Sequence, residues 1–444
     1  MKKIIEYGLY LFAFLLPWQT RWIIKSVEIN HAYWEYGTMS LYAVDVILLV
    51  ILFLWIFLKI YHTRFRHISL GKNKDLLSYS IWGLFAISLA SIVFSGDRWL
   101  AFFITSRLFF ALGLFYLIVD FDYKKNRLIF YLTSGLASSA LLAIWQFISQ
   151  DTFANKWLGL ASHQAATLGT SVVEIYKYGS LPERWLRAYG SFDHPNMLGG
   201  MMAIGIIILF KILLERHEKE RQVKKINLIN LLLYFYFIIF SAALFFSFSR
   251  TAWLGLVLGL FGFVIFLVKD KNWKGLKVIF GGIGVMIISF LPLWSVYHDL
   301  AIARFNIYSR LEQRSIVERV SSSNEAWKII KESPWGGAGL GNYGLAVKGN
   351  EPDEQSWYYQ PVHNVFLLIW AETGILGFLL FIGILVSVVT NSLKTNNKFN
   401  LALIATISFF MLFDHWLWSL HFGILIFWLL LGLSVRANNS FYDD

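Results

Sequence analysis

Residues 41–61 read LYAVDVILLVILFLWIFLKIY, an apolar block in which Asp45 is the only acid. An α-helix rises about 1.5 Å per residue, so about 20 apolar residues cross a bilayer core of about 30 Å. Comparable blocks follow one another along the 444 residues, of which 57% are hydrophobic and 15% charged. Soluble domains average about 45–50% and about 25%. The sequence therefore predicts an all-α polytopic membrane protein.

These blocks, each bounded by charged residues, predict about twelve transmembrane helices in a single integral membrane domain that covers residues 1–444. The first block follows two lysines as in a signal peptide, but it lacks a small-residue cleavage pattern, and we interpret it as an uncleaved anchor. The predicted helices lie near residues 4–17, 41–61, 76–95, 99–119, 128–148, 196–214, 228–248, 251–268, 278–294, 363–391, 401–413 and 417–434.

The distribution of lysine and arginine predicts the orientation of the helices. The short loops of one face hold most of these cations, whereas those of the other face hold only Arg21, Lys25, Arg98 and Arg250. By the positive-inside rule the basic face is cytoplasmic, which places both termini inside the cell and the protein in the cytoplasmic (inner) membrane. The net charge of +11 is thus a topology signal and does not indicate a nucleic-acid partner.

Two long segments, 149–195 and 295–361, then fall on the outer face, and loops of this length usually carry function. In the second segment, Ser322 and Glu325 fit a capping box that opens a helix running to Glu332. Within the membrane, Asp45 and Arg107 are expected to pair or to share a polar network, because an isolated charge is costly there.

Several classes of function are excluded by what the sequence lacks. It has no cysteine, hence no disulfide, no thiolate metal site and no cysteine nucleophile. It has no Walker A or HExxH motif, and its histidines lack metal-ligand spacing, so we expect no metal and no other cofactor. Gly339, Gly341 and Gly344 fit GxGxxG, but without a buried strand before them and an apolar helix after them they do not predict a dinucleotide site.

Four motifs on or near the predicted outer face carry unusual polar residues. They are RAYGSFDHPNMLGG at 187–200, SRT at 249–251, the stretch from Arg319 to Gly344, and HNVFLLIWAETGILG at 363–377. Each has an ordinary structural interpretation: a helix start at Pro195 and Asn196, an interfacial arginine, a glycine-rich connection and an interfacial histidine.

Together, the four motifs indicate a particular chemistry. The planar guanidinium of arginine donates two parallel hydrogen bonds to phosphate oxygens, and histidine is the common proton acceptor near neutral pH. An enzyme that handles a lipid-linked phosphate at the outer membrane boundary would need both. Glu372 follows His363 by two and a half helical turns, about 13.5 Å deeper and on the opposite side of the helix. We therefore expect it not to share the contacts of His363.

The ordered set of motifs resembles the O-antigen ligase and O-antigen polymerase superfamily. The matching elements are Arg187 with GSFDHPN at 190–196, Ser249-Arg250, Arg319 with Trp327 and ESPWGGAGLGNY at 332–343, and His363-Asn364 with Leu367, Glu372 and Gly374. The resemblance implies a GT-C-like helical membrane fold and a glycosyltransferase of cell-envelope polysaccharide biosynthesis. Such an enzyme moves a glycan from undecaprenyl diphosphate to an acceptor hydroxyl at the outer face, without metal or nucleotide.

The resemblance also implies roles for single residues. Arg187 and Arg250 would bind the diphosphate, and His363 would help to activate the acceptor. Arg319 would be a third diphosphate ligand, with Arg310 and Arg314 as competitors for that role. The supporting residues are His194, Asn196, Asn364 and Glu372. The implied partners are the lipid-linked donor glycan, a glycan or lipid-linked acceptor and membrane lipids; ligase and polymerase activity share these motifs and both stay open.

A transporter or flippase of polyprenyl-linked oligosaccharides is the alternative, because it would have a similar number of helices and buried charges. Such a protein should carry functional charges near the middle of the membrane and on both faces, with short loops. Here the notable residues gather at one face beside two long loops. The sequence therefore favours the enzyme.

Overall fold

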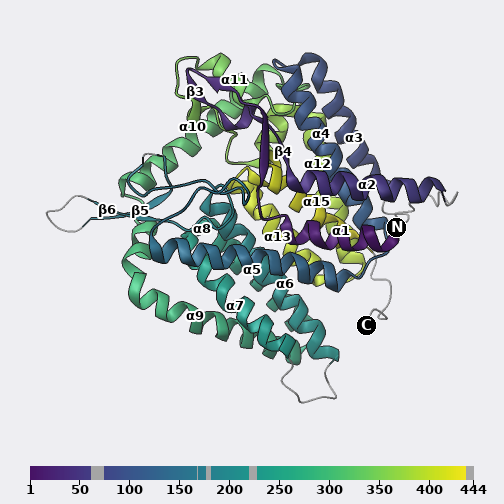
Figure 1. Ribbon diagram of the computed structural model, residues 1–444, viewed down its shortest axis with the longest axis vertical. Coiled ribbons are helices and arrows are strands. Elements are labelled where there is room, and N and C mark those ends of the chain that lie inside the picture. The colour runs from purple at the N-terminus through teal and green to yellow at the C-terminus, as the bar shows by residue number, and fades with distance from the viewer. Residues whose placement is uncertain (62–74, 168, 177–181, 220–227, 437–444) are drawn as a thin grey trace.

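The computed structural model describes residues 1–61, 75–167, 169–176, 182–219 and 228–436 (Figure 1). Every predicted apolar block coincides with a helix, and the all-α fold class is confirmed. Nine helices of the described ranges are long and apolar enough to cross a membrane, and α1, α13 and α15 are shorter. The helices are α1 Lys2–Leu15, α2 Ala43–Tyr61, α3 Asp75–Phe94, α4 Arg98–Asp120, α5 Lys125–Ser149, α6 Pro195–Lys219, α7 Leu228–Ser247, α8 Arg250–Lys269, α9 Trp273–Phe305, α12 Val365–Lys394, α13 Lys398–Phe413 and α15 His421–Val435.

Short elements lie between these helices. Three antiparallel strand pairs form, β1 with β4, β2 with β3 and β5 with β6, and the sequence analysis did not predict them. Two- to five-residue strands carry too little alternation of apolar and polar residues to stand out from a loop. The short elements are β1 Arg21–Lys25, β2 Glu28–Ile29, β3 Ala32–Tyr33, β4 Met39–Tyr42, β5 Val172–Ile175, β6 Glu183–Leu186, the 3₁₀ turns Glu35–Gly37 and Ser356–Tyr358, and helices α10 Arg310–Glu332, α11 Tyr343–Asn350 and α14 Trp416–Ser419.

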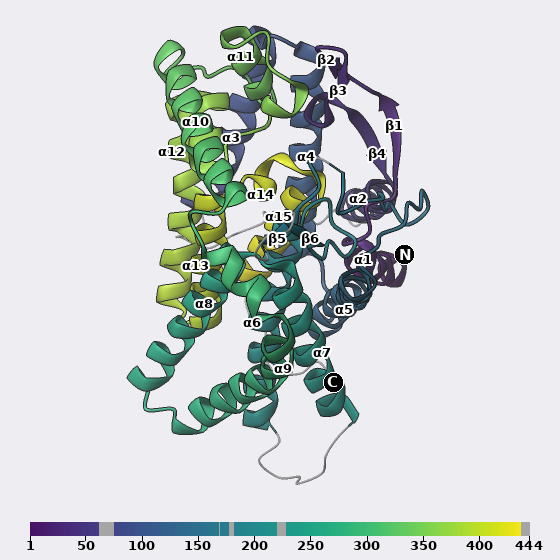
Figure 2. The ribbon, with the colours of Figure 1, turned by 90° about the vertical axis from the view of Figure 1, so that its left-hand side faces the viewer.

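Helices α6 and α15 form the centre of the bundle (Figures 1 and 2). Every residue of α15 is buried, and so is most of the apolar part of α6. A helix that is apolar on all sides must be enclosed by others, and α6 packs against α7, α8 and α9 while α15 packs against α4 and α12. The first turn of α6 and the residues that precede α15 are thereby held rigidly, and both belong to the site described below.

The segments that the sequence places on the outer face lie together at one end of the bundle. The Asn30 amide donates to the carbonyls of Pro352 and Glu354, both at 2.7 Å. The Trp34 indole donates to the carbonyl of Tyr359 at 2.9 Å, and Arg310 pairs with Glu174 at 2.7 Å. Their orientation towards the outside remains a prediction. Some of the cations on which it rests lie outside the described residues: Arg64, Arg66, Lys72, Lys74, Arg221, Lys224 and Lys225.

Helix α10 differs from the expected helix in where it begins. It ends at Glu332 as predicted, but it starts at Arg310, and the Ser322 hydroxyl donates to the carbonyl of Arg319 at 3.2 Å within the helix. The capping-box interpretation of Ser322 and Glu325 was therefore wrong. The preceding residues, LEQR and VER among them, are good helix formers, so the helix continues upstream through a polar, exposed stretch.

Candidate active site

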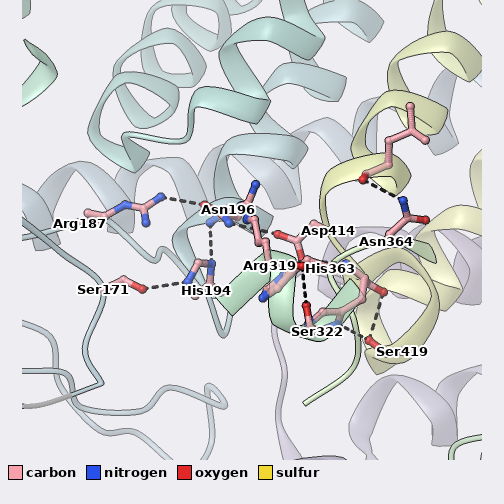
Figure 3. A network of polar contacts seen from close by, with 12 residues as sticks. Ser171, Arg187, His194, Asn196, Arg319, Ser322, His363, Asn364, Asp414 and Ser419 are labelled. Atoms are coloured by element: carbon pink, nitrogen blue, oxygen red, sulfur yellow. Dashed lines mark hydrogen bonds and ion pairs between the residues drawn. The ribbon is translucent and has the colours of Figure 1, made fainter. Parts of the chain in front are cut away.

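A cavity of about 370 Å³ opens among the gathered segments. Its lining includes His194, which precedes α6, His363, which precedes α12, and Asp414 and His415, which connect α13 to α14. Gln360 also lines it. Figure 3 shows His194, His363 and Asp414 converging from elements that are far apart in the sequence. The cavity is thus lined by residues of two of the four sequence motifs, 187–200 and 363–377. It is also lined by the polar turn at Asp414 and His415, which belongs to none of the motifs.

His363 is held by the start of α12. The next residue, Asn364, caps that helix by accepting a hydrogen bond from the Leu367 amide at 3.1 Å, and its side-chain amide donates to the carbonyl of Leu412 at 3.3 Å. The His363 Nδ1 atom is buried and has no hydrogen-bond partner among the described residues. It lies 3.6 Å from Oδ1 of Asp414, which is too long for a hydrogen bond but short enough for an ion pair once the ring is protonated.

Asp414 is fixed on both of its oxygens. Oδ1 accepts a hydrogen bond from the backbone amide of His415 at 2.8 Å, and Oδ2 accepts one from the Asn196 side chain at 3.1 Å. Burial raises the pKa of Asp414, but the interactions with His363, His415 and His194 outweigh it and hold the pKa well below its usual range. Asp414 is therefore a permanent carboxylate that faces His363.

Asn196 connects this carboxylate to Arg187. The Arg187 guanidinium donates to Oδ1 of Asn196 at 2.9 Å and to the carbonyl of Ser247 at 2.8 Å (Figure 3). Burial lowers the pKa of Arg187 to about 10; Tyr189 and Asp414 oppose this change, and the neighbouring cations Arg250 and Arg319 add to it. Since this value is well above neutral pH, Arg187 stays charged.

His194 supports the same chain of contacts. Its Nδ1 accepts a hydrogen bond from the backbone amide of Asn196 at 3.1 Å, and its Nε2 lies 2.9 Å from the Ser171 hydroxyl. Burial, followed by the charge of Arg187, lowers the pKa of His194 to about 3. The ring is therefore neutral, with Nε2 donating to Ser171, and its contacts orient the first turn of α6.

Arg250 belongs to a cluster of four arginines. It starts α8 and pairs with Glu312 at 2.5 Å, and Arg304 binds the other oxygen of the same buried carboxylate. Arg319, the fourth member beside Arg187, makes no side-chain hydrogen bond or ion pair with any residue that the structure describes. Burial lowers the pKa of Arg319, Asp414 opposes that change, and the charge of Arg250 adds to it. The arginines thus outnumber the carboxylates that neutralise them.

The two competitors of Arg319 are engaged elsewhere. Arg310 pairs with Glu174 at 2.7 Å, and Arg314 pairs with Glu318 at 2.7 Å while its guanidinium lies over the ring of Trp357. Of the three arginines on α10, Arg319 is thus the one without a carboxylate partner among the residues that the structure describes.

Comparison with known proteins places part of this site in a family. Residues 235–382, which include Arg250, Arg319 and His363, match the family model described as O-antigen ligase. This region of the chain is similar to the O-antigen ligase family. The expected resemblance to the O-antigen ligase and polymerase superfamily is thereby confirmed. Arg187 and Asp414 lie outside the matched O-antigen ligase region, on either side of it.

Two curated proteins are similar to the chain. An O-antigen ligase of Salmonella typhimurium is 27% identical over 214 residues, which are 46% of this chain and 47% of that protein. An uncharacterized protein of Haemophilus influenzae is 26% identical over 166 residues, which are 34% of this chain and 41% of that protein. The chain thus spans less than half the length of each of these relatives.

Glu372 lies in the O-antigen ligase region but away from the cavity. Its carboxylate accepts a hydrogen bond from the Trp418 indole at 3.2 Å, and its carbonyl accepts one from the Gly339 amide at 2.9 Å. Helix α12 is kinked at Gly374, where φ is +68°, and a Cβ atom on Gly337 would lie 2.4 Å from the Glu372 carbonyl carbon. The glycine-rich stretch and Glu372 therefore form a packed connection that supports α12.

Asp414, His415, Arg304 and Glu312 were not singled out as site residues from the sequence. One signal was available for Asp414, since it stands as a lone acid in the apolar stretch FFMLFDHWLW at 409–418. Nothing in the polar segment around Glu312 distinguishes that glutamate from its neighbours. Only the packing of α9 and α10 shows that it is buried between two arginines.

Among the residues that the structure describes, His363, Asp414 and His415 could hold a metal ion, since one ligand atom of each lies within 4.8 Å of the others. A zinc site brings its ligand atoms to about 2.0–2.2 Å from the ion, and hence closer together than this. In addition, Nδ1 of His415 lies 2.6 Å from the Ser419 hydroxyl, which already satisfies it. The expectation of a metal-independent O-antigen ligase stays a prediction.

Proposed function

We propose that the protein is a membrane glycosyltransferase of the O-antigen ligase or polymerase type. It moves a glycan from undecaprenyl diphosphate to an acceptor hydroxyl at the outer face of the cytoplasmic membrane, with segments 149–195 and 295–361 on that face. The observation that carries the proposal is the single cavity in which a histidine with an unpartnered ring nitrogen faces a fixed carboxylate, next to a surplus of arginines.

The arginine cluster would bind the donor diphosphate. The Arg319 guanidinium has free N–H donors, and Arg250 and Arg187 add positive charge near it. The single carboxylate of Glu312 neutralises only part of this positive charge. As the bond between the anomeric carbon and the phosphate oxygen breaks, negative charge moves onto that oxygen. Fixed cations bind the departing diphosphate more strongly than the intact donor, which lowers the barrier.

His363 would accept the proton of the acceptor. The hydroxyl oxygen forms a bond to the anomeric carbon, its O–H bond breaks, and the proton passes to the imidazole and later to solvent. Asp414 acts as a positioning residue: with the Nδ1 proton directed towards its carboxylate, Nε2 keeps the lone pair that takes the proton, and the imidazolium that forms is stabilised. Asn196 and His194 hold Asp414 and Arg187 in their relative positions.

The test is a transfer assay with purified protein in detergent. The protein is incubated with undecaprenyl-diphosphate glycan and candidate acceptors, and release of undecaprenyl diphosphate is measured. We expect release that depends on the acceptor and is lost in His363→Ala but kept in the control His298→Ala, a half-exposed histidine that lies outside the cavity on α9. If the protein moves the lipid-linked glycan across the membrane of reconstituted vesicles without releasing undecaprenyl diphosphate, the result would favour the transporter instead.

A further inference from the structure

A second, shallow hollow adjoins the cavity on the outer side of α10. This outer groove is lined by Glu318, Glu325, Trp357, Tyr358 and Gln360, together with parts of α10 and α11. Gln360 lines both the outer groove and the cavity that holds His363, so the two spaces are neighbours on either side of this residue. The enclosed volume of the groove is only about 30 Å³, which suits the face of an extended ligand better than a whole buried molecule.

The aromatic side of the outer groove is preorganised and exposed. Trp357 is 51% exposed, and its ring lies 6.4 Å from that of Tyr358 in an edge arrangement. The Arg314 guanidinium lies 5.1 Å from the Trp357 ring centroid, and the Tyr358 hydroxyl lies 3.3 Å from that of Ser321. An exposed indole that is held in place offers a flat apolar surface with a polar edge. The C–H face of a pyranose ring matches such a surface.

The polar side of the outer groove has an unsatisfied acceptor. Oε2 of Glu325 is buried and has no hydrogen-bond partner among the described residues. Buried polar atoms normally have partners, so a free carboxylate oxygen in a groove points to a donor that arrives with a ligand. The hydroxyl groups of a sugar are such donors. An anionic ligand would instead be repelled by Glu318 and Glu325.

We propose that the outer groove is a carbohydrate subsite that binds a sugar unit of the glycan remote from the reacting bond. The inference rests on the proposed function, since the glycan must already occupy the cavity beside His363. One sugar unit stacks on Trp357, its hydroxyls donate to Glu325, and Gln360 contacts the chain where it passes from the cavity to the groove. The protein thereby distinguishes a longer glycan from a single sugar.

The test compares two donors in the transfer assay, undecaprenyl diphosphate with one sugar and with an oligosaccharide of several units, and the same acceptor. In Trp357→Ala and Glu325→Gln we expect kcat/KM for the oligosaccharide donor to fall about tenfold, mainly through KM, because a contact remote from the reacting bond is lost. With the single-sugar donor both variants should match the wild type. The control is Trp99→Ala, which removes another exposed tryptophan, 73% exposed, from the first turn of α4.

The outcomes separate the subsite from the proposed function. Variants that match the wild type with both donors, or that lose activity equally with both, would overturn the subsite while leaving the transferase intact. A wild-type protein that transfers from neither donor would overturn the proposed function, and the subsite with it. Thermal melting of each variant shows whether a loss reflects unfolding.

Discussion

Two histidine–aspartate pairs in this protein have the same chemical groups and opposite settings. Nε2 of His421 on α15 lies 2.6 Å from Oδ1 of Asp45 on α2, the ring stacks on Tyr42 with centroids 3.6 Å apart, and the Tyr42 amide donates to the second carboxylate oxygen at 3.0 Å. His363 instead lies 3.6 Å from Asp414 and lines a cavity. One pair is closed and satisfied, and the other is open.

The difference shows that residue type alone does not indicate reactivity. In the closed pair, Nε2 of His421 and both carboxylate oxygens of Asp45 have partners within the bundle, so the pair holds α2 against α15. Asp45 and Arg107 were expected to pair or to share a polar network, and no ion pair joins them among the described residues. Their charges interact, and they share Tyr42: the Arg107 guanidinium carbon lies 5.5 Å from its ring centroid, and its backbone amide donates to Asp45. In the open pair, a ring nitrogen is left for chemistry.

The largest effect should come from removing the open histidine. His363→Ala should slow transfer about 10²–10⁴-fold, because the acceptor hydroxyl loses the group that takes its proton. Single-turnover rates at saturating donor measure the chemical step, and donor binding should change little. His363→Gln can form a hydrogen bond but cannot take the proton; if it keeps most of the wild-type rate, the base assignment is wrong.

Removing a cation beside the open pair should have the next largest effect. Arg187→Ala and Arg250→Ala should each lower the transfer rate about 10²–10³-fold while the protein still inserts into the membrane, since fewer donors meet the departing diphosphate. Lysine at either position should restore activity only in part, because it has the charge without the two parallel donors. Near-normal release of undecaprenyl diphosphate by both alanine variants would place the diphosphate elsewhere.

The role of the Asp414 carboxylate in the open pair can be tested by measuring how the transfer rate depends on pH. Asp414→Asn should lower the rate by about 10- to 100-fold, as expected for a group that orients a base. In the wild type the rate should fall in acid as the imidazole becomes protonated, and the lowered pKa of Asp414 keeps its charge throughout this range. Without the negative charge, the imidazolium is less stable, so the acid limb of the rate profile should move to lower pH. An unchanged acid limb would argue against the contact.

The closed pair should give the smallest effect on transfer and a clear effect on stability. Asp45→Asn or His421→Ala should lower the melting temperature, because breaking a buried pair typically destabilises by about 3–5 kcal/mol. Protein that remains folded should transfer at close to the wild-type rate. A variant with an unchanged melting temperature and a strongly reduced rate would show that the two pairs are not as different as their geometry indicates.

The helices and the motifs could be predicted from the sequence, because each depends on neighbouring residues. The length of a run of apolar residues decides whether a helix can cross a bilayer, and each predicted apolar block coincides with a helix. The position of His363 directly before α12 follows from Asn364, whose side chain is suited to cap a helix. The family resemblance was equally local, since it depends on short runs in a fixed order.

The partners of those residues were decided by the tertiary structure alone. Asn196 and Asp414 are 218 positions apart, and Arg187 and Ser247 are 60 apart, yet each pair is joined by a hydrogen bond. Glu312 became the shared partner of two arginines only because the start of α10 lies beside the start of α8 and the end of α9. Side-chain pairing across such distances depends on how helices pack, and packing depends on the shape of the whole bundle rather than on any single segment. The sequence determined which groups are present, and the packing of the helices determined which of them meet.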